Sequence, residues 1–257
     1  MSFGSAFVRR GILYFFIINC SFLSPAFGQE DIAGFIEQAA QVLVNTPSFP
    51  DALQASIVLY QKETEQNPNN AKAFEKLAWA CLELGEIVVK GKLEWYQRSH
   101  MAAKQSLALN EASAQGHFLY ALTKGLIVED FPFWKLSPKT PFELERHLLR
   151  ALEIEPNHAR ALNMMGMLLN KVPGPLRMLM KGKRKDAEGY LIRAVQAEPT
   201  STRLRLLLAE YYYEEKKLQF AKEQAKRIMN ESSPKELWLW ENKHKRDAVE
   251  LLSLLGE

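Results

Sequence analysis

A short phrase recurs along the chain: a small residue, an apolar residue, any residue, a second apolar residue, and then a polar turn. It is clearest in Ala151-Leu152-Glu153-Ile154-Glu155-Pro156 and Ala194-Val195-Gln196-Ala197-Glu198-Pro199, and weaker copies end near Pro68, Glu111 and Pro234. The five turns are 43, 45, 43 and 35 residues apart. Because proline lacks an amide hydrogen and restricts the residue before it, each phrase predicts the end of one helix and the start of the next.

The segments that follow these turns have apolar residues at spacings of three and four, which is typical of amphipathic helices. Examples are Phe74, Leu77, Ala78 and Cys81, then Leu162, Met165, Gly166 and Leu169, then Leu208, Ala209 and Tyr212. No window of comparable length alternates with a period of two. We therefore expect an all-α array of helical hairpins in residues 29–257, with repeats at about 37–70, 71–113, 114–158, 159–201 and 202–235. A capping helix at 236–257 would cover the last repeat with Leu237, Trp240, Ala248, Leu251 and Leu252.

These residues carry a resemblance to tetratricopeptide (TPR) repeats. The set Phe74, Leu77, Ala78, Cys81 and Gly85 resembles the first helix of a repeat, and Ala187, Leu191, Ala194, Val195 and Pro199 resemble its second helix and closing turn. The resemblance implies a right-handed superhelix of about five hairpins. It also implies a concave groove, made by the first helix of each hairpin, that binds a partner.

The three longer steps exceed the TPR length of ~34 residues. The extra residues are predicted between the helices of a hairpin, at about 86–98, 128–143 and 173–186. This layout is similar to the T-component type associated with tripartite ATP-independent periplasmic (TRAP) transporters, most of all in the stretches 163–166, 172–176 and 182–187. That resemblance implies an exported protein that binds a partner protein or handles a hydrophobic ligand.

Helical phase selects the residues expected to line the groove, here named the inner face. They are Lys72, Glu75, Trp79, Glu83, Gln115, Phe118, Leu122, Leu126, Arg160, Asn163, Met167, Asn170, Arg203, Leu206, Glu210 and Tyr213. The binding hypothesis rests on eight of these, namely Trp79, Phe118, Leu122, Arg160, Asn163, Met167, Leu206 and Tyr213. Trp79 and Tyr213 are its expected anchors, since aromatic residues dominate binding hot spots. The alternative is that aromatic inserts fold into the groove and cover these side chains.

The predicted inserts have a chemistry of their own. Trp95 and Tyr96 in one, and Phe131, Phe133 and Trp134 in another, are either packed in the core or exposed as a contact surface. The segment 171–193 contains seven basic and two acidic residues with Leu176, Met178, Leu179 and Met180 between them. It is either a solvated loop or a surface for anionic lipid or an acidic partner.

Residues 1–28 have the three parts of a secretory signal: Arg9 and Arg10, an apolar run from Gly11 to Leu23, and small residues at Ala26 and Gly28. We expect cleavage after Gly28 and export, to the periplasm if the source is a Gram-negative bacterium. The alternative is a retained membrane anchor, although a run of ~13 residues is shorter than the ~20 that span a bilayer.

Charge and candidate chemistry narrow the function further. The formal net charge is +3, and Arg9 and Arg10 supply most of the excess, so nucleic-acid binding has no electrostatic support. Outside the leader Cys81 is the single cysteine, and no two histidines are four residues apart. With no catalytic, metal or cofactor motif, we expect no enzyme and no cofactor. Two hypotheses remain: a scaffold that binds a protein partner, or a carrier of a hydrophobic small molecule.

Overall fold

The computed structural model describes residues 49–129, 137, 139–182 and 184–256. The proposed leader, the first part of the first predicted repeat, and Phe131, Phe133 and Trp134 lie outside these ranges. Within them the chain forms helices and turns, with no β-strand. The all-α prediction is therefore confirmed for the part of the chain that the structure describes.

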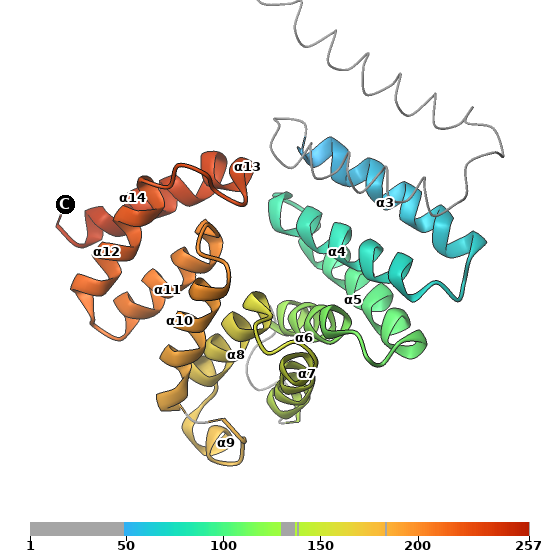
Figure 1. Cartoon of the computed structure of the whole chain (residues 1–257), viewed down its shortest axis with the longest axis horizontal. Helices are drawn as coiled ribbons and strands as arrows, with labels where there is room; N and C mark the ends of the chain where they lie inside the picture. The colour runs from blue at the N-terminus through green and yellow to red at the C-terminus, as the bar shows by residue number, and fades with distance from the viewer. Residues whose placement is uncertain (1–48, 130–136, 138, 183, 257) are drawn as a thin grey trace, which may run out of the picture. The chain divides into compact units, whose positions relative to one another are not determined.

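The helices follow one another as hairpins, coloured in chain order in Figure 1. Among the described residues the first seven elements are α3 (Phe49–Gln66), α4 (Ala71–Ile87), α5 (Lys92–Leu109), α6 (Ala114–Glu129), α7 (Thr140–Ile154), α8 (Ala159–Lys171) and α9 (Gly174–Met178). After them come η2 (Arg184–Asp186), α10 (Ala187–Ala197), α11 (Thr202–Glu214), α12 (Leu218–Met229), α13 (Leu237–Leu239), η3 (Trp240–His244) and α14 (Lys245–Leu254). Within these residues α4 packs on α5, α6 on α7, α8 on α10 and α11 on α12, and α3 packs on α4.

Each turn between repeats ends in a side chain that caps the next helix. The capping residues are Asn70, Ser113, His158 and Ser201, which accept from the backbone N–H groups of Ala73, Gly116, Ala161 and Leu204 at 3.1, 2.9, 3.2 and 3.4 Å. Such a bond satisfies one of the N–H groups that the first helical turn leaves without a partner. The recurring phrase of the sequence thus stops one helix and starts the next.

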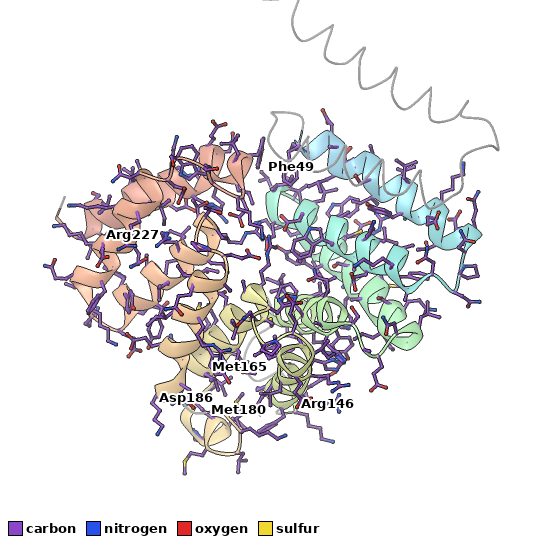
Figure 2. All side chains as sticks on the ribbon, viewed as in Figure 1. Phe49, Arg146, Met165, Met180, Asp186 and Arg227 are labelled. Atoms are coloured by element: carbon purple, nitrogen blue, oxygen red, sulfur yellow. The ribbon has the colours of Figure 1, made fainter. Side chains whose placement is uncertain are left out.

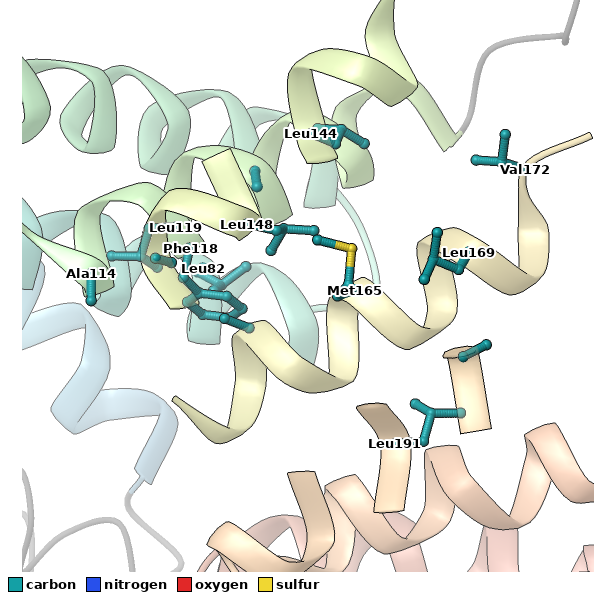
Figure 3. Packing of buried hydrophobic residues seen from close by; sticks show 14 of the residues in the cluster. Leu82, Ala114, Phe118, Leu119, Leu144, Leu148, Met165, Leu169, Val172 and Leu191 are labelled. Atoms are coloured by element: carbon teal, nitrogen blue, oxygen red, sulfur yellow. The ribbon is translucent and has the colours of Figure 1, made fainter. Parts of the chain in front are cut away.

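Small residues let the paired helices approach closely. A Cβ atom on Gly85 of α4 would lie 2.7 Å from Cε1 of Tyr96 on α5, and one on Gly166 of α8 would lie 2.7 Å from Cγ of Leu191 on α10. The main hydrophobic core runs along these hairpins, and Figure 3 shows part of it around Met165. The members labelled in that view are Leu82, Ala114, Phe118, Leu119, Leu144, Leu148, Met165, Leu169, Val172 and Leu191.

The prediction that residues 86–98 form an insert between two helices is wrong. Helix α4 continues to Ile87 and α5 starts at Lys92, so the extra residues lengthen the helices and leave a short turn at 88–91. Gly91, at a φ of 78°, supplies the left-handed residue of that turn. The hairpin of α8 and α10 differs, because its extra residues form a true loop, here named the α8–α10 loop (residues 172–186), that contains α9 and η2.

The C-terminal segment covers the last hairpin. Ala248 and Leu251 of α14 are buried against Ala209 and Ile228, and Trp240 Nε1 donates to the Ile228 carbonyl at 2.8 Å. The segment is not one α-helix, because the π-helical turn η3 divides it. The expected capping helix is therefore present with an interruption.

Candidate binding face

Helices α4, α6, α8 and α11, the first of each described hairpin, contact one another through the inner face. The Arg160 guanidinium of α8 lies 4.2 Å from the centre of the Trp79 ring on α4. The same ring lies 6.4 Å from that of Phe118 on α6. The inner face thus brings together residues that are up to 120 positions apart in the sequence.

The centre of this face is a group of charged side chains, here named the ion cluster: Glu83, Glu86, Arg160, Arg203 and Glu236. Glu83 Oε1 accepts from Arg160 Nη1 at 3.0 Å, and its Oε2 accepts from Arg203 Nη2 at 3.0 Å. Arg203 Nη2 also lies 3.1 Å from Glu86 Oε2. Arg160 Nη2 lies 3.9 Å from Glu236 Oε1. One carboxylate of α4 thus joins α8 and α11.

Because these side chains are buried, the ionised form of each is stabilised by its oppositely charged neighbours. The Glu83 side chain is 6% exposed and those of Arg160 and Arg203 are 14% exposed. Burial acts to raise the pKa of Glu83, but the two arginines outweigh it and lower the pKa to about 2. The glutamates in turn raise the pKa of Arg203 against the effect of burial. Glu83 and Arg203 are therefore both ionised at neutral pH.

Three residues of the binding hypothesis are core residues and not groove residues. Phe118 is 1% exposed, and Leu206 and Asn163 are each 6% exposed. Phe118 is enclosed because Trp79 and His158 approach its ring from two other elements, and Leu206 packs in the core under α14. The prediction that these side chains line an open groove is wrong.

Other residues of the binding hypothesis are partly exposed. Leu122 of α6, Met167 of α8 and Tyr213 of α11 are each partly buried against the main core. Beside them, Asn170 Nδ2 donates to Glu214 Oε2 at 3.2 Å and joins α8 to α11. The inner face therefore has a closed part around the ion cluster and an open part, defined by Leu122, Leu126, Met167 and Tyr213.

Packing decides between the two interpretations of the aromatic residues at 95 and 96. Tyr96 is 9% exposed and belongs to the main core, and Trp95 packs partly buried against a second core group with Phe49 and Leu84. Tyr96 is therefore a core residue, whereas Trp95 packs against the second core group and keeps part of its side chain exposed. Phe131, Phe133 and Trp134 lie outside the described residues.

Sequence reasoning missed a histidine pair in the α6–α7 hairpin. His117 Nε2 must donate to the Glu111 carbonyl, 2.9 Å away, because a carbonyl only accepts. The neutral ring then has a bare Nδ1, which accepts from Nδ1–H of His147 at 2.9 Å. The His147 ring is also stacked on Tyr120 at 4.1 Å. Positions 117, 120 and 147 hold no recognisable motif, so the spacing could not reveal this contact.

Reactive chemistry has little support among the described residues. Burial raises the pKa of the Cys81 thiol to about 11, which keeps it protonated and weakly nucleophilic. In the described ranges no group of three or more His, Cys, Asp and Glu side chains is placed to hold a metal ion. None of the helices there is long and apolar enough to cross a membrane.

A profile of the family described as regulator of microtubule dynamics protein 1-3 matches residues 36–172, which is more than half of the chain. The chain belongs to this family. The matched segment ends just after α8, so it includes Glu83 and Arg160 of the ion cluster but not Arg203. No curated protein matches the chain.

Solved structures of TPR proteins align with the chain. A thermophilic TPR protein of Thermus thermophilus aligns with a TM-score of 0.61 and 18% identity, over 86% of this chain and 100% of the other. A TPR protein of Parabacteroides merdae aligns with a TM-score of 0.49 and 15% identity, over 88% and 84% of the two chains. The first likeness identifies a TPR-like helical-repeat architecture, and at such identities it shows the fold alone.

Proposed function

We propose that the protein is a non-enzymatic scaffold that binds a segment of a protein partner on the open part of the inner face. One observation carries the proposal. Partly exposed large apolar side chains follow one another on the first helices of three successive hairpins, where a solvated helix face would present polar groups. The neighbouring ion cluster holds α4, α8 and α11 together, so the face is a rigid platform that loses little entropy on binding.

The structure changes which side chains we expect to anchor the partner. The Trp79 ring already stacks against Arg160 of the ion cluster and lies near Phe118, so we no longer expect it to anchor a partner. Tyr213 stays a candidate anchor, and Met167 replaces Trp79 as the second, because Met167 is partly exposed on the neighbouring helix.

A photo-crosslinking experiment tests the site. p-Benzoylphenylalanine in place of Tyr213 should crosslink to a protein partner, and Met167→Glu in the same chain should reduce the crosslink about tenfold or more, since a hot-spot contact contributes ~2 kcal/mol. The matched controls are the same probe in place of Phe220, which is exposed on α12, and Met101→Glu on α5. Equal crosslinking from positions 213 and 220, with circular dichroism unchanged, would place the partner elsewhere.

The family supplies the first partner to test, because its name refers to microtubules. Purified full chain should then sediment with polymerised tubulin and lose this property with Met167→Glu. We also propose export through residues 1–28, and these two proposals require different compartments. Sequencing the N-terminus of the protein from its native source tests the first of them: a start at Gln29 supports export, and a chain that keeps its leader contradicts cleavage and leaves the microtubule partner open.

The carrier alternative is less favoured by the described side chains. Charged groups occupy the centre of the inner face, where a hydrophobic ligand would have to displace the paired Glu83 and Arg203. Native mass spectrometry of the purified protein distinguishes the two, because a carrier retains a small apolar molecule that adds a fixed mass.

A further inference from the structure

The α8–α10 loop exposes two large apolar side chains that are neighbours in the sequence. Met178 is 79% exposed and Leu179 is 74% exposed. Single exposed apolar residues are common on protein surfaces and need no explanation. Met178 and Leu179, however, are consecutive residues in the middle of the loop, and together they present a continuous apolar surface to solvent.

This part of the loop is held in place by specific contacts. Arg177 Nη1 donates to the Val172 carbonyl at 2.8 Å, and the Gly182 N–H donates to Glu145 Oε1 at 2.8 Å. Met180, labelled in Figure 2, is 3% exposed and anchors the loop in the core. The loop therefore buries Met180 while it turns the two preceding side chains outward, so their exposure is a property of the fold.

The surroundings of this apolar pair are basic. Lys171, Lys181 and Lys185 are exposed, and the loop contains five basic residues against one acidic residue, the exposed Asp186. The buried Glu145 is already engaged by the Gly182 N–H. The surface thus combines an apolar tip with an excess of positive charge.

We propose that the tip of the α8–α10 loop docks on an anionic lipid bilayer. Met178 and Leu179 would enter the boundary between headgroups and acyl chains, while the three lysines contact anionic headgroups with their stems along the apolar side chains. Charge complementarity selects an anionic surface. The apolar tip favours a lipid surface over an acidic protein groove, because a bilayer offers acyl chains directly beneath its charges. This contact is separate from partner binding on the inner face.

Vesicle sedimentation of the full chain tests the proposal. The probes are vesicles of phosphatidylcholine alone and vesicles that contain phosphatidylserine at about one third, at low and at physiological salt. We expect binding to the anionic vesicles, weaker at higher salt. Met178→Ser with Leu179→Ser should lower the partition coefficient about tenfold or more, and so should Lys181→Gln with Lys185→Gln.

Matched controls separate the loop from the rest of the chain. Leu218→Ser with Phe220→Ser removes an exposed apolar pair from α12, and Lys104→Gln with Lys243→Gln removes two exposed charges elsewhere. Both should bind as the unmodified chain does.

Three results would overturn the proposal: the loop variants bind vesicles as well as the unmodified chain does, the control variants lose as much binding as the loop variants, or the unmodified chain binds both kinds of vesicle equally. A different result would assign the loop to an acidic protein instead: the unmodified chain binds no vesicles, and the lysine variant no longer sediments with polymerised tubulin. Met167→Glu should leave vesicle binding unchanged, so this proposal and the scaffold proposal fail separately.

Discussion

Glu83 is the residue on which the inner face depends most directly. Its two oxygens accept from arginines that lie 77 and 120 positions further along the chain. Taking three charges out of water is costly, and the cost is recovered only because the geometry pairs them closely. Removing the carboxylate would therefore leave two buried cations without their shared partner, with Glu86 beside Arg203 and Glu236 beside Arg160 as the remaining acidic contacts.

We predict that Glu83→Gln lowers the free energy of unfolding by about 3–5 kcal/mol, the range for removing one partner of a buried ion pair. Glu86→Gln should cost much less, since the Glu86 side chain is 25% exposed and contacts only one of the two arginines. Urea denaturation of both variants at neutral pH measures the difference. Similar losses in the two variants would contradict a central role for Glu83.

At this scale helical phase can assign residues to a face of their helix, but it does not say what they do there. The 3.6-residue period places Glu83, Trp79, Arg160 and Arg203 on one side of their helices. Whether such residues pair or remain solvated depends on how closely α4 approaches α11, and local spacing contains no information on that distance. The same limit explains Phe118, whose position is on the expected face and whose burial comes from other helices.

At the scale of elements, α8 and α10 approach each other closely at Gly166. A Cβ there would lie 2.9 Å from the Ala187 carbonyl oxygen as well as 2.7 Å from Leu191 Cγ. A backbone atom cannot move aside as a side chain can. By contrast, a Cβ on Gly189 of α10 would meet no atom within 4 Å.

These two glycines form a matched pair of mutations to alanine. Gly166→Ala should destabilise the protein by about 1–3 kcal/mol, because it overpacks the helix contact. Gly189→Ala should stabilise it by about 0.5–1 kcal/mol, because alanine is the better helix former and the site has space. Thermal or urea unfolding of both proteins checks the opposite signs. If Gly166→Ala is neutral, the two helices do not approach as closely as described.

Element boundaries were predicted best where the sequence contains a chemical stop. The turns around Pro156 and Pro199 were located from the proline, and the structure adds the caps at His158 and Ser201. The region 86–98 has no such stop before Gly91, so comparison with a shorter repeat suggested an insert where the chain adds helical turns. Repeat length fixes how many residues are extra, but only helix propensity and packing decide what they form.

At the scale of the whole molecule, the histidines share one property. The pKa of each of the five is lowered, and burial is the largest cause at every one. The pKa of His147 falls to about 4 and that of His244 to about 3. Positive charge adds to the effect of burial at His244, where Arg203 of the ion cluster is the next cause. The folded protein therefore holds neutral histidines that the unfolded chain would protonate near pH 6.5.

This difference predicts a loss of stability in mild acid. A group whose pKa is lower in the folded state takes up protons in the unfolded state first, so stability is complete above pH 6.5 and falls as the pH drops toward 4. A single such histidine contributes up to about 1.4 kcal/mol per pH unit, and we expect a total loss of about 2–4 kcal/mol between pH 6.5 and 5. Urea unfolding at pH 7, 6 and 5 measures it. His244→Gln should flatten the dependence, because this position then has no proton to gain beside Arg203. A free energy of unfolding that stays constant from pH 7 to 5 would show that the histidines are solvated in the folded protein.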